Sequence, residues 1–161
     1  RAADAEGSYD FNHIYTGSAA NSESDKESDT AVNQAKIPVA QTIPAAPIPI
    51  RVGLVDSGVD ADHIVFRKID IRRWGCDGKT HPSVHGTAVA ALMVGQSSRF
   101  HGVLPQASLY AADIYCDGAN SGTGGSADKI AGALAWLAKQ NVAVINLSLV
   151  GPANATLGRM V

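Results

Sequence analysis

The order of apolar and polar positions predicts which parts of this chain fold. Residues 50–55, 108–115 and 142–149 are short apolar runs, rich in β-branched side chains in the first and last, which indicates buried strands. Residues 68–73 alternate charged and apolar side chains, as in a half-exposed strand. Residues 85–95 run from a histidine through apolar positions to a glycine and predict a short buried helix.

A second helix is predicted over residues 126–140, because apolar side chains recur there at helical spacing. Its expected buried face consists of Ile130, Ala133, Leu134, Leu137 and Ala138. Residues from 153 onward begin a further helix that the chain does not finish. Strands and helices alternate without internal repeats, so we expect an α/β fold with a parallel sheet and right-handed crossovers.

The first 46 residues have a different composition. They hold seven acidic and three basic side chains among Gly, Ser, Asn, Ala and Pro, and too few apolar groups to offset chain entropy. Residues 43–49 are rich in proline and predict a stiff extended linker. We therefore expect residues 1–46 to be a disordered acidic tail and linker, and residues 47–161 to be the folded domain. A pro-segment remnant is the functional alternative for the tail.

Overall composition excludes several classes of partner. The chain has 161 residues, is 45% hydrophobic and carries a net charge of −2, so no nucleic acid or polyanion partner is implied. No apolar run approaches the ~18 residues of a membrane span. The sequence starts without Met and without a signal-peptide pattern, so we expect it to begin inside a longer product from which a secretion signal could have been removed.

Two side chains are candidate functional residues, because each would be held in a fixed position by a strand or a helix. Asp56 follows the strand over residues 50–55, and the carboxyl end of a buried parallel strand faces the crevice where open α/β sheets bind ligands. His85 starts the first predicted helix, and Gly86 would let another segment approach its ring closely. Taken alone, His85 is better explained as part of a capped core helix.

Other polar groups have competing interpretations. Asp60, Asp62 and His63 could bind calcium, although such a loop is more often only solvated. His81 and His85 have the spacing of zinc ligands on a helix, but Pro82 takes His81 out of helical geometry. The glycine-rich loop that ends at residue 125 could hold phosphate or pair with an extended peptide.

Four segments, in order, are similar to the subtilisin-like serine peptidases, or subtilases. They are V-D-S-G-V-D at residues 55–60, H-G-T-A-V-A at 85–90, G-V-L-P-Q-A-S-L at 102–109, and V-I-N-L-S-L-V-G-P at 144–152. The resemblance covers residues 50–161 and implies a three-layer parallel-sheet subtilisin-like fold, incomplete in this chain. It implies serine endopeptidase activity, with the family's order of aspartate, histidine and serine.

The resemblance also assigns roles to residues. His85 would be the general base and later the acid, and Asp56 would fix its tautomer. An extended polypeptide substrate would pair with two backbone segments, Gly124–Gly125 and Ser148, Leu149 and Val150. Cys76 and Cys116 are either a disulfide or two free thiols, and neither is expected to be the nucleophile. No cofactor is expected, and a structural calcium ion is left open as considered above.

Two departures from the family pattern limit this assignment. Val150 stands where the family has the first glycine of S-L-G-G, and neither the nucleophile motif G-T-S-x-A nor the oxyanion-hole asparagine occurs in the chain. We expect the N-terminal part of a secreted or periplasmic enzyme, with its serine beyond Val161 and the rest of that enzyme as partner. This chain alone would be inactive. The alternatives are a non-catalytic peptide-binding fragment of the same fold and, less favoured, a phosphate-binding α/β domain.

Overall fold

A computed structural model describes residues 10–17, 50–116 and 125–161. Its centre is a four-stranded sheet in the order β3-β4-β2-β6, with every pair parallel. The strands are β2 (Arg51–Asp56), β3 (Ile71–Trp74), β4 (Ser108–Asp113) and β6 (Val144–Leu147). After β2 the chain forms β3 and then β4 on one side of β2, and it then forms β6 on the other side, so β2 lies where the connections change direction.

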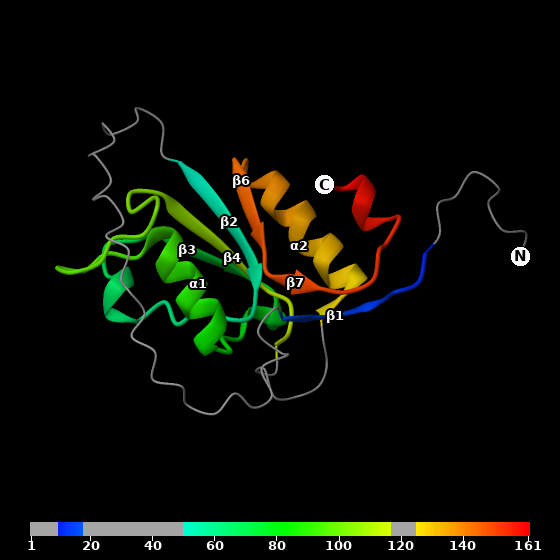
Figure 1. The fold of residues 1–161 in the computed structure, drawn as a ribbon, viewed down its shortest axis with the longest axis horizontal. Helices are drawn as coiled ribbons and strands as arrows, with labels where there is room; N and C mark the ends of the chain where they lie inside the picture. The colour runs from blue at the N-terminus through cyan, green and yellow to red at the C-terminus, as the bar shows by residue number, and fades with distance from the viewer. Residues whose placement is uncertain (1–9, 18–49, 117–124) are drawn as a thin grey trace, which may run out of the picture.

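Helix α1 (Val84–Val94) and helix α2 (Ala127–Lys139) cover opposite faces of this sheet (Figure 1). In β2, Val52 and Leu54 belong to the buried cluster on the α1 face, and Val55 belongs to the cluster on the α2 face. Strand β4 divides its side chains in the same way, since alternate residues of a strand point to opposite faces. The predicted three-layer α/β fold is therefore confirmed.

Both helices lie close to their predicted positions. In α2 the expected face is buried except for Ala138, which is exposed. In α1, only Gly86, Ala90 and Val94 are fully buried, one residue per turn, so this helix is half-exposed and not wholly buried as predicted.

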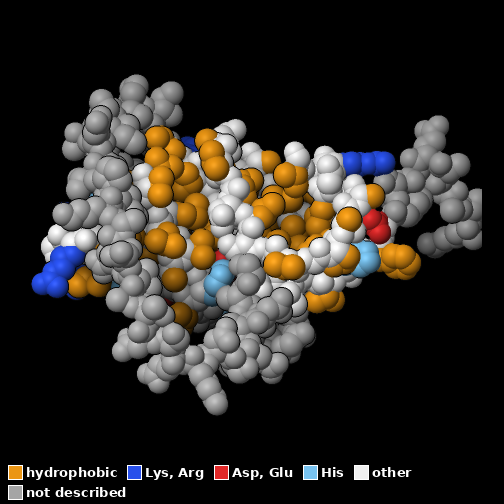
Figure 2. Space-filling view, viewed as in Figure 1, with side chains coloured by type: hydrophobic (Ala, Val, Ile, Leu, Met, Phe, Trp, Pro, Cys, Tyr) orange, Lys and Arg blue, Asp and Glu red, His pale blue; other side chains and the backbone are white. Residues whose placement is uncertain are grey.

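The predicted buried strand at residues 142–149 is corrected in length and burial. Strand β6 is shorter, and its Val144 and Leu147 are 64% and 38% exposed. In the described part of the chain β6 pairs only with β2, so it is the edge of the sheet and one flank has no neighbour. Figure 2 shows hydrophobic side chains at the surface on the face that carries β6 and α2.

Short 3₁₀ helices complete the described chain: η1 (Ile64–Phe66), η2 (Cys76–Gly78) and η3 (Leu157–Arg159). The last of these stands where a further helix was expected from residue 153. No helix in the described ranges has the length and apolar character that crossing a bilayer requires.

A second, smaller sheet corrects the prediction for the N-terminal region. Strand β1 (Ile14–Gly17) pairs antiparallel with both β5 (Gly125–Ser126) and β7 (Leu149–Val150). Residues 10–17 therefore belong to the folded structure and not to a disordered tail. Sequence patterns did not reveal this because four residues form no recognisable period and their partners are far along the chain. The remaining residues of the predicted tail and linker, 1–9 and 18–49, lie outside the described part, and their assignment stays a prediction.

Candidate active site

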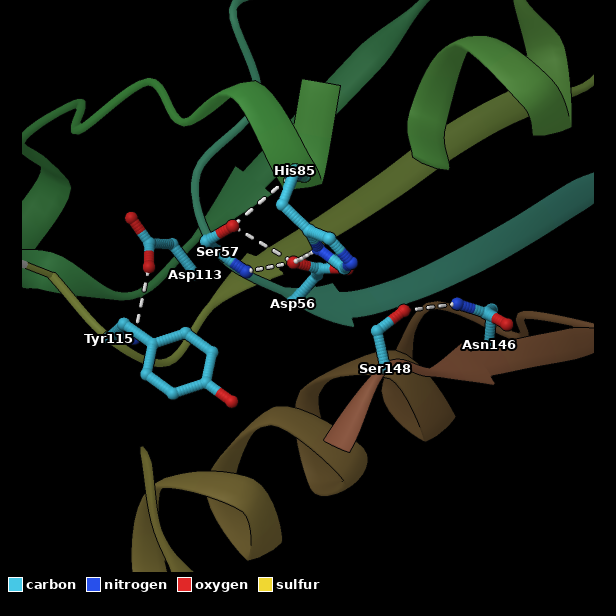
Figure 3. Close-up of polar contacts among 8 residues, drawn as sticks. Asp56, Ser57, His85, Asp113, Tyr115, Asn146 and Ser148 are labelled. Carbon is cyan, nitrogen blue, oxygen red and sulfur yellow. Dashed lines mark hydrogen bonds and ion pairs between the residues drawn. The ribbon is translucent and has the colours of Figure 1, made fainter. Parts of the chain in front are cut away.

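The carboxylate of Asp56 is the buried centre of the candidate site. The residue ends β2 and is 1% exposed. Its Oδ1 accepts three hydrogen bonds: from the Ser57 backbone N at 2.6 Å, from the Ser57 Oγ at 2.9 Å, and from His85 Nδ1 at 2.8 Å (Figure 3). A carboxylate held by several donors keeps one orientation, so the ring that it binds is also fixed.

His85 lies in the first turn of α1, and its imidazole reaches from the helix toward β2. Its side chain is 28% exposed, whereas that of Asp56 is 1% exposed. The imidazole ring therefore contacts a buried carboxylate while part of the ring is accessible from the surface. A neutral imidazole that donates from Nδ1 carries its basic lone pair on Nε2, which is the arrangement needed in a general base.

The residues after His85 lock the start of α1 against the loop that follows β2. A Cβ at Gly86 would lie 2.2 Å from the backbone oxygen of Ser57, so only glycine fits this approach. The Gly86 backbone N donates to the Ser57 Oγ at 3.2 Å, and the Thr87 Oγ1 accepts from the Asp60 backbone N at 3.0 Å. The prediction that Gly86 permits a close approach is confirmed, and the approach is what sets the position of His85.

Ser148 lies beside the carboxyl end of β2, on the side opposite β4. Its backbone N donates to the Val55 backbone oxygen at 3.1 Å, and its Oγ accepts from the Asn146 Nδ2 at 2.7 Å. Figure 3 shows Asn146, in β6, and Ser148, directly after β6, near Asp56. The hydrogen bond to Val55 attaches the start of the predicted substrate-binding segment to the strand that carries Asp56.

The two predicted substrate-binding segments, in β5 and β7, lie on either side of β1 and both pair with it. Gly125 in β5 pairs with Tyr15, whereas Leu149 and Val150 in β7 pair with Gly17 and Thr16. Gly124 lies outside the described residues, as does most of the glycine-rich loop considered as a phosphate site. The two segments thus flank one strand, as the two sides of a peptide-binding groove do.

Two further groups beside Asp56 were not identified as site residues from the sequence. Asp113 is the parallel-strand partner of Asp56, and its Oδ1 accepts from the backbone N of Tyr115 at 3.0 Å and of Cys116 at 3.1 Å. Burial raises the pKa of the Asp113 carboxyl, and the charge of Asp56 acts in the same direction. Asp113 was noticed only as a misplaced charge, although neighbouring parallel strands end at the same edge of a sheet.

The phenol of Tyr115 is buried next to both carboxylates. Burial, followed by the charges of Asp56 and Asp113, raises the pKa of Tyr115 to about 12. Its hydroxyl has no hydrogen-bond partner among the described residues. Tyr115 therefore stays protonated at neutral pH.

Cys76 and Cys116 form a disulfide, which decides between the two alternatives that the sequence left open. The bond joins η2 to the segment just beyond β4, across 40 positions of sequence. It therefore closes a covalent loop that includes α1 and β4, and it anchors the chain where it leaves Asp113.

The loop considered for calcium uses its polar groups locally. The Asp60 Oδ1 accepts from the Asp62 backbone N at 3.1 Å, and the His63 Nδ1 accepts from the Val65 backbone N at 3.4 Å. Across the described ranges, the one set of three acidic, histidine or cysteine donor atoms within 4.8 Å of one another is that of Cys76, Asp113 and Cys116. Two of these are disulfide-bonded, so the set does not resemble a metal site. Calcium binding by Asp60, Asp62 and His63, which the sequence left as the less favoured alternative to a solvated loop, is not tested by these contacts.

Comparison with known proteins identifies the family. The subtilase family profile matches residues 49–158, and the chain belongs to this family. It is 30% identical to subtilisin DY of Bacillus licheniformis over 111 residues, which is 66% of this chain and 39% of that protein. It is 29% identical to subtilisin E of Bacillus subtilis over 133 residues, which is 78% of this chain and 33% of that protein. The chain thus spans between a third and two fifths of these relatives.

Solved structures agree with this assignment. The prenylagaramide maturation protease PagA superposes with a TM-score of 0.57 at 26% identity, over 69% of this chain and 40% of that one. Fervidolysin from Fervidobacterium pennivorans, a keratinolytic enzyme related to subtilisin, also gives 0.57 at 26% identity, over 69% of this chain and 19% of that one. The fold is therefore that of the N-terminal catalytic region of a subtilase.

Proposed function

We propose that this chain is the N-terminal part of a serine endopeptidase in which Asp56 and His85 are two members of an Asp-His-Ser triad. The observation that carries the proposal is the 2.8 Å contact between the His85 Nδ1 and the buried Asp56 Oδ1. A serine hydroxyl is a poor nucleophile at neutral pH and needs a neutral imidazole to take its proton. His85 takes that proton and returns it to the leaving amine, and Asp56 holds the tautomer and stabilises the imidazolium.

The nucleophile is proposed to lie in the part of the enzyme that follows Val161. Family membership and the limited share of its relatives that this chain spans support this placement. Among the described residues Ser57 and Ser148 are the buried serines, and the hydroxyls of both are engaged in hydrogen bonds. The side-chain donor of the oxyanion hole is placed in the same missing part, so we expect the 161-residue chain alone to be inert.

The substrate is proposed to be an extended polypeptide that pairs with Gly124–Gly125 and with Ser148, Leu149 and Val150. Exposed hydrophobic side chains on β6 support an interface with the remainder of the same enzyme. The disulfide supports a secreted or periplasmic location, since such bonds persist in oxidising compartments.

A second candidate is a non-catalytic peptide-binding protein of the same fold. It is favoured by the way in which β5 and β7 already hold an extended strand. It differs from the first candidate in lacking a reactive serine.

Covalent labelling distinguishes the two candidates. The natural polypeptide that contains this chain and the 161-residue chain alone are each treated with a serine-directed fluorophosphonate and with casein. We expect labelling and casein turnover only in the longer polypeptide, at a serine outside this chain, and loss of both in His85→Ala. Labelling of a serine within this chain, with turnover that depends on His85, refutes the placement of the nucleophile. No labelling in either sample supports the non-catalytic candidate.

A further inference from the structure

The second carboxylate oxygen of Asp56 is buried and has no hydrogen-bond partner in the part of the chain that the structure describes. The Ser57 backbone N, the Ser57 Oγ and the His85 Nδ1 all bind the other oxygen, Oδ1. A carboxylate spreads its charge over both oxygens, and a buried charged oxygen that has lost its water needs a donor. A donor for Oδ2 is therefore expected close to Asp56.

The hydroxyl of Tyr115 is the complementary group. The residue is 9% exposed, and within residues 10–17, 50–116 and 125–161 its hydroxyl also has no partner. Because the pKa of Tyr115 is raised to about 12, the hydroxyl keeps its proton at neutral pH and can donate it. The charge of Asp56 contributes to this raised pKa, so the two groups are near enough to interact. Figure 3 shows the phenol extending from its backbone toward the side on which Asp56 and Ser148 lie.

We infer that Tyr115 is a positioning residue for the catalytic pair: its hydroxyl donates to one buried water molecule, and this water donates to the Asp56 Oδ2. The inference rests on the proposed function, because it takes Asp56 and His85 to be that pair. No direct hydrogen bond joins the two atoms, and a bridging water is a common way to satisfy buried polar groups. With both oxygens held, the carboxylate cannot turn away from the His85 ring.

A donor at Oδ2 also limits how strongly Asp56 attracts the proton on the His85 Nδ1. Hydrogen bonds to a carboxylate stabilise its charge, so each donor that is lost makes the remaining contacts of the carboxylate stronger. Without the Tyr115 hydroxyl, Oδ1 should therefore accept more strongly from Nδ1. The imidazolium form of His85 should then be stabilised relative to the neutral ring.

Other titratable groups lie close to the pair and have to be separated from this effect. Asp113, at the end of β4, interacts through its charge with Asp56 and with Tyr115. His81, in the loop before α1, interacts in turn with Asp113. Asp60, in the loop after β2, contacts the first turn of α1 through its backbone N. Asp113 is the group among these that faces both Asp56 and Tyr115, so the test includes a substitution there.

Steady-state kinetics of the natural polypeptide gives the first test. Tyr115→Phe keeps the ring and removes the hydroxyl, so kcat should fall about 3- to 10-fold while KM for a peptide substrate is unchanged. The acid limb of kcat/KM reports protonation of the general base, and it should move to higher pH by about half to one unit. Tyr110→Phe is the matched control, because Tyr110 is a second buried tyrosine on β4 and its ring packs against Trp136. It should leave kcat and the acid limb unchanged.

The same kinetics can contradict the inference in three ways. An acid limb that does not move in Tyr115→Phe overturns it. A raised KM at unchanged kcat places the hydroxyl against substrate instead and also overturns it. The shift caused by Tyr115→Phe should be the same in the Asp113→Asn background, since distant and independent effects add. If the shift disappears in that background, the hydroxyl acts through Asp113 and the inference is wrong.

Nuclear magnetic resonance of His85 tests the inference without turnover. In the natural polypeptide, the Nδ1 proton of His85 should resonate further downfield in Tyr115→Phe than in the unaltered protein or in Tyr110→Phe. An unchanged resonance overturns the inference. A polypeptide that shows the change but neither cleaves casein nor reacts with the fluorophosphonate refutes the endopeptidase, while the link between Tyr115 and Asp56 stands. An active, labelled enzyme without the change refutes the link alone.

A crystal structure of the unaltered natural polypeptide decides the case in which Tyr115→Phe does not fold. It should show a water molecule within hydrogen-bond distance of both the Tyr115 hydroxyl and the Asp56 Oδ2. A different donor bound to Oδ2, with the Tyr115 hydroxyl bonded elsewhere, overturns the inference.

Discussion

The two sheets of this molecule are built in different ways. The parallel sheet has β2 and β4 at its centre, each six residues long, covered by a helix on each face. The antiparallel sheet has a four-residue strand between two strands of two residues each, and Ile14 and Val150 are more than half exposed. The first carries Asp56 and its contact with His85, and the second carries the segments proposed to hold substrate.

Under the proposed function, this difference separates the catalytic pair from the segments that would bind substrate. A hydrogen bond between Asp56 and His85 is effective only at a fixed geometry, so both residues lie on long, packed elements. Peptide recognition by strand addition needs only exposed backbone and one or two pockets, so short strands are enough. Changes in the parallel sheet should therefore act on turnover or stability, and changes in the antiparallel sheet should act on selectivity.

The largest expected effect is on turnover, at the pair held by the parallel sheet. In the natural polypeptide, His85→Ala and Asp56→Asn should each lower kcat by about 10⁴–10⁶, the range found for triad members of serine peptidases. Steady-state kinetics on a peptide substrate checks this, with His101→Ala as a control at an exposed histidine away from the pair. A loss below about tenfold in either variant contradicts the proposed roles.

The disulfide between Cys76 and Cys116 should have the next largest effect, on stability. Removing it with Cys76→Ser and Cys116→Ser frees a loop that spans 40 positions and should lower the free energy of unfolding by about 3–4 kcal/mol. Denaturant unfolding of the natural polypeptide measures this. The folded double variant should keep its turnover on a peptide substrate, since neither cysteine is the nucleophile. Complete loss of turnover in a folded double variant would show that the separation of roles is wrong.

A smaller effect, on selectivity alone, is expected at Val150 in the antiparallel sheet. Val150→Gly removes a branched side chain from the segment that the family uses to wall its specificity pocket, so turnover of large aromatic residues should rise relative to small ones. One or two methylenes of fit correspond to about 1–3 kcal/mol, or roughly 10–200-fold. Because Val150 is 51% exposed, we expect the lower end of this range. The change in preference is measured by competition between peptide substrates in a library. Val144→Ala on β6 is the control. An unchanged preference in Val150→Gly means that Val150 faces away from substrate.

The smallest expected effect is a pH dependence of stability at Asp113. Burial raises the pKa of this carboxyl above its ordinary value of 3.8, so the folded protein binds its proton more tightly than the unfolded chain does. Stability should therefore fall as the pH rises from about 4 through the raised pKa. Asp113→Asn keeps an acceptor for the backbone N–H groups and should remove this decline, leaving the variant more stable above the window. Melting temperatures from pH 3 to 7 test this against Asp62→Asn, and parallel curves for Asp113→Asn and the unaltered protein contradict it.

Much of the parallel sheet could be predicted, because its strands and helices have local patterns. The apolar periodicity of α2 identified four of its five predicted buried side chains, since a helix repeats its buried face every three or four residues. The exposure of β6 could not be predicted in this way, because a strand's pattern does not say whether a neighbour lies on each side of it. Burial of Tyr15 was missed for a similar reason, since the pocket that covers it comes from residues 151 and 152.

The sequence by itself determined the order of the strands and helices of the parallel sheet, the subtilase family, and the two candidate catalytic residues, because each depends on local spacing or on motifs read in order. Only the tertiary structure decided that Cys76 and Cys116 are bonded, that Asp113 and Tyr115 lie beside Asp56, and that residues 14–17 lie between β5 and β7. These contacts join positions from tens to more than a hundred residues apart. No local pattern encodes them, because they exist only once the sheet has brought the ends of its strands to one edge.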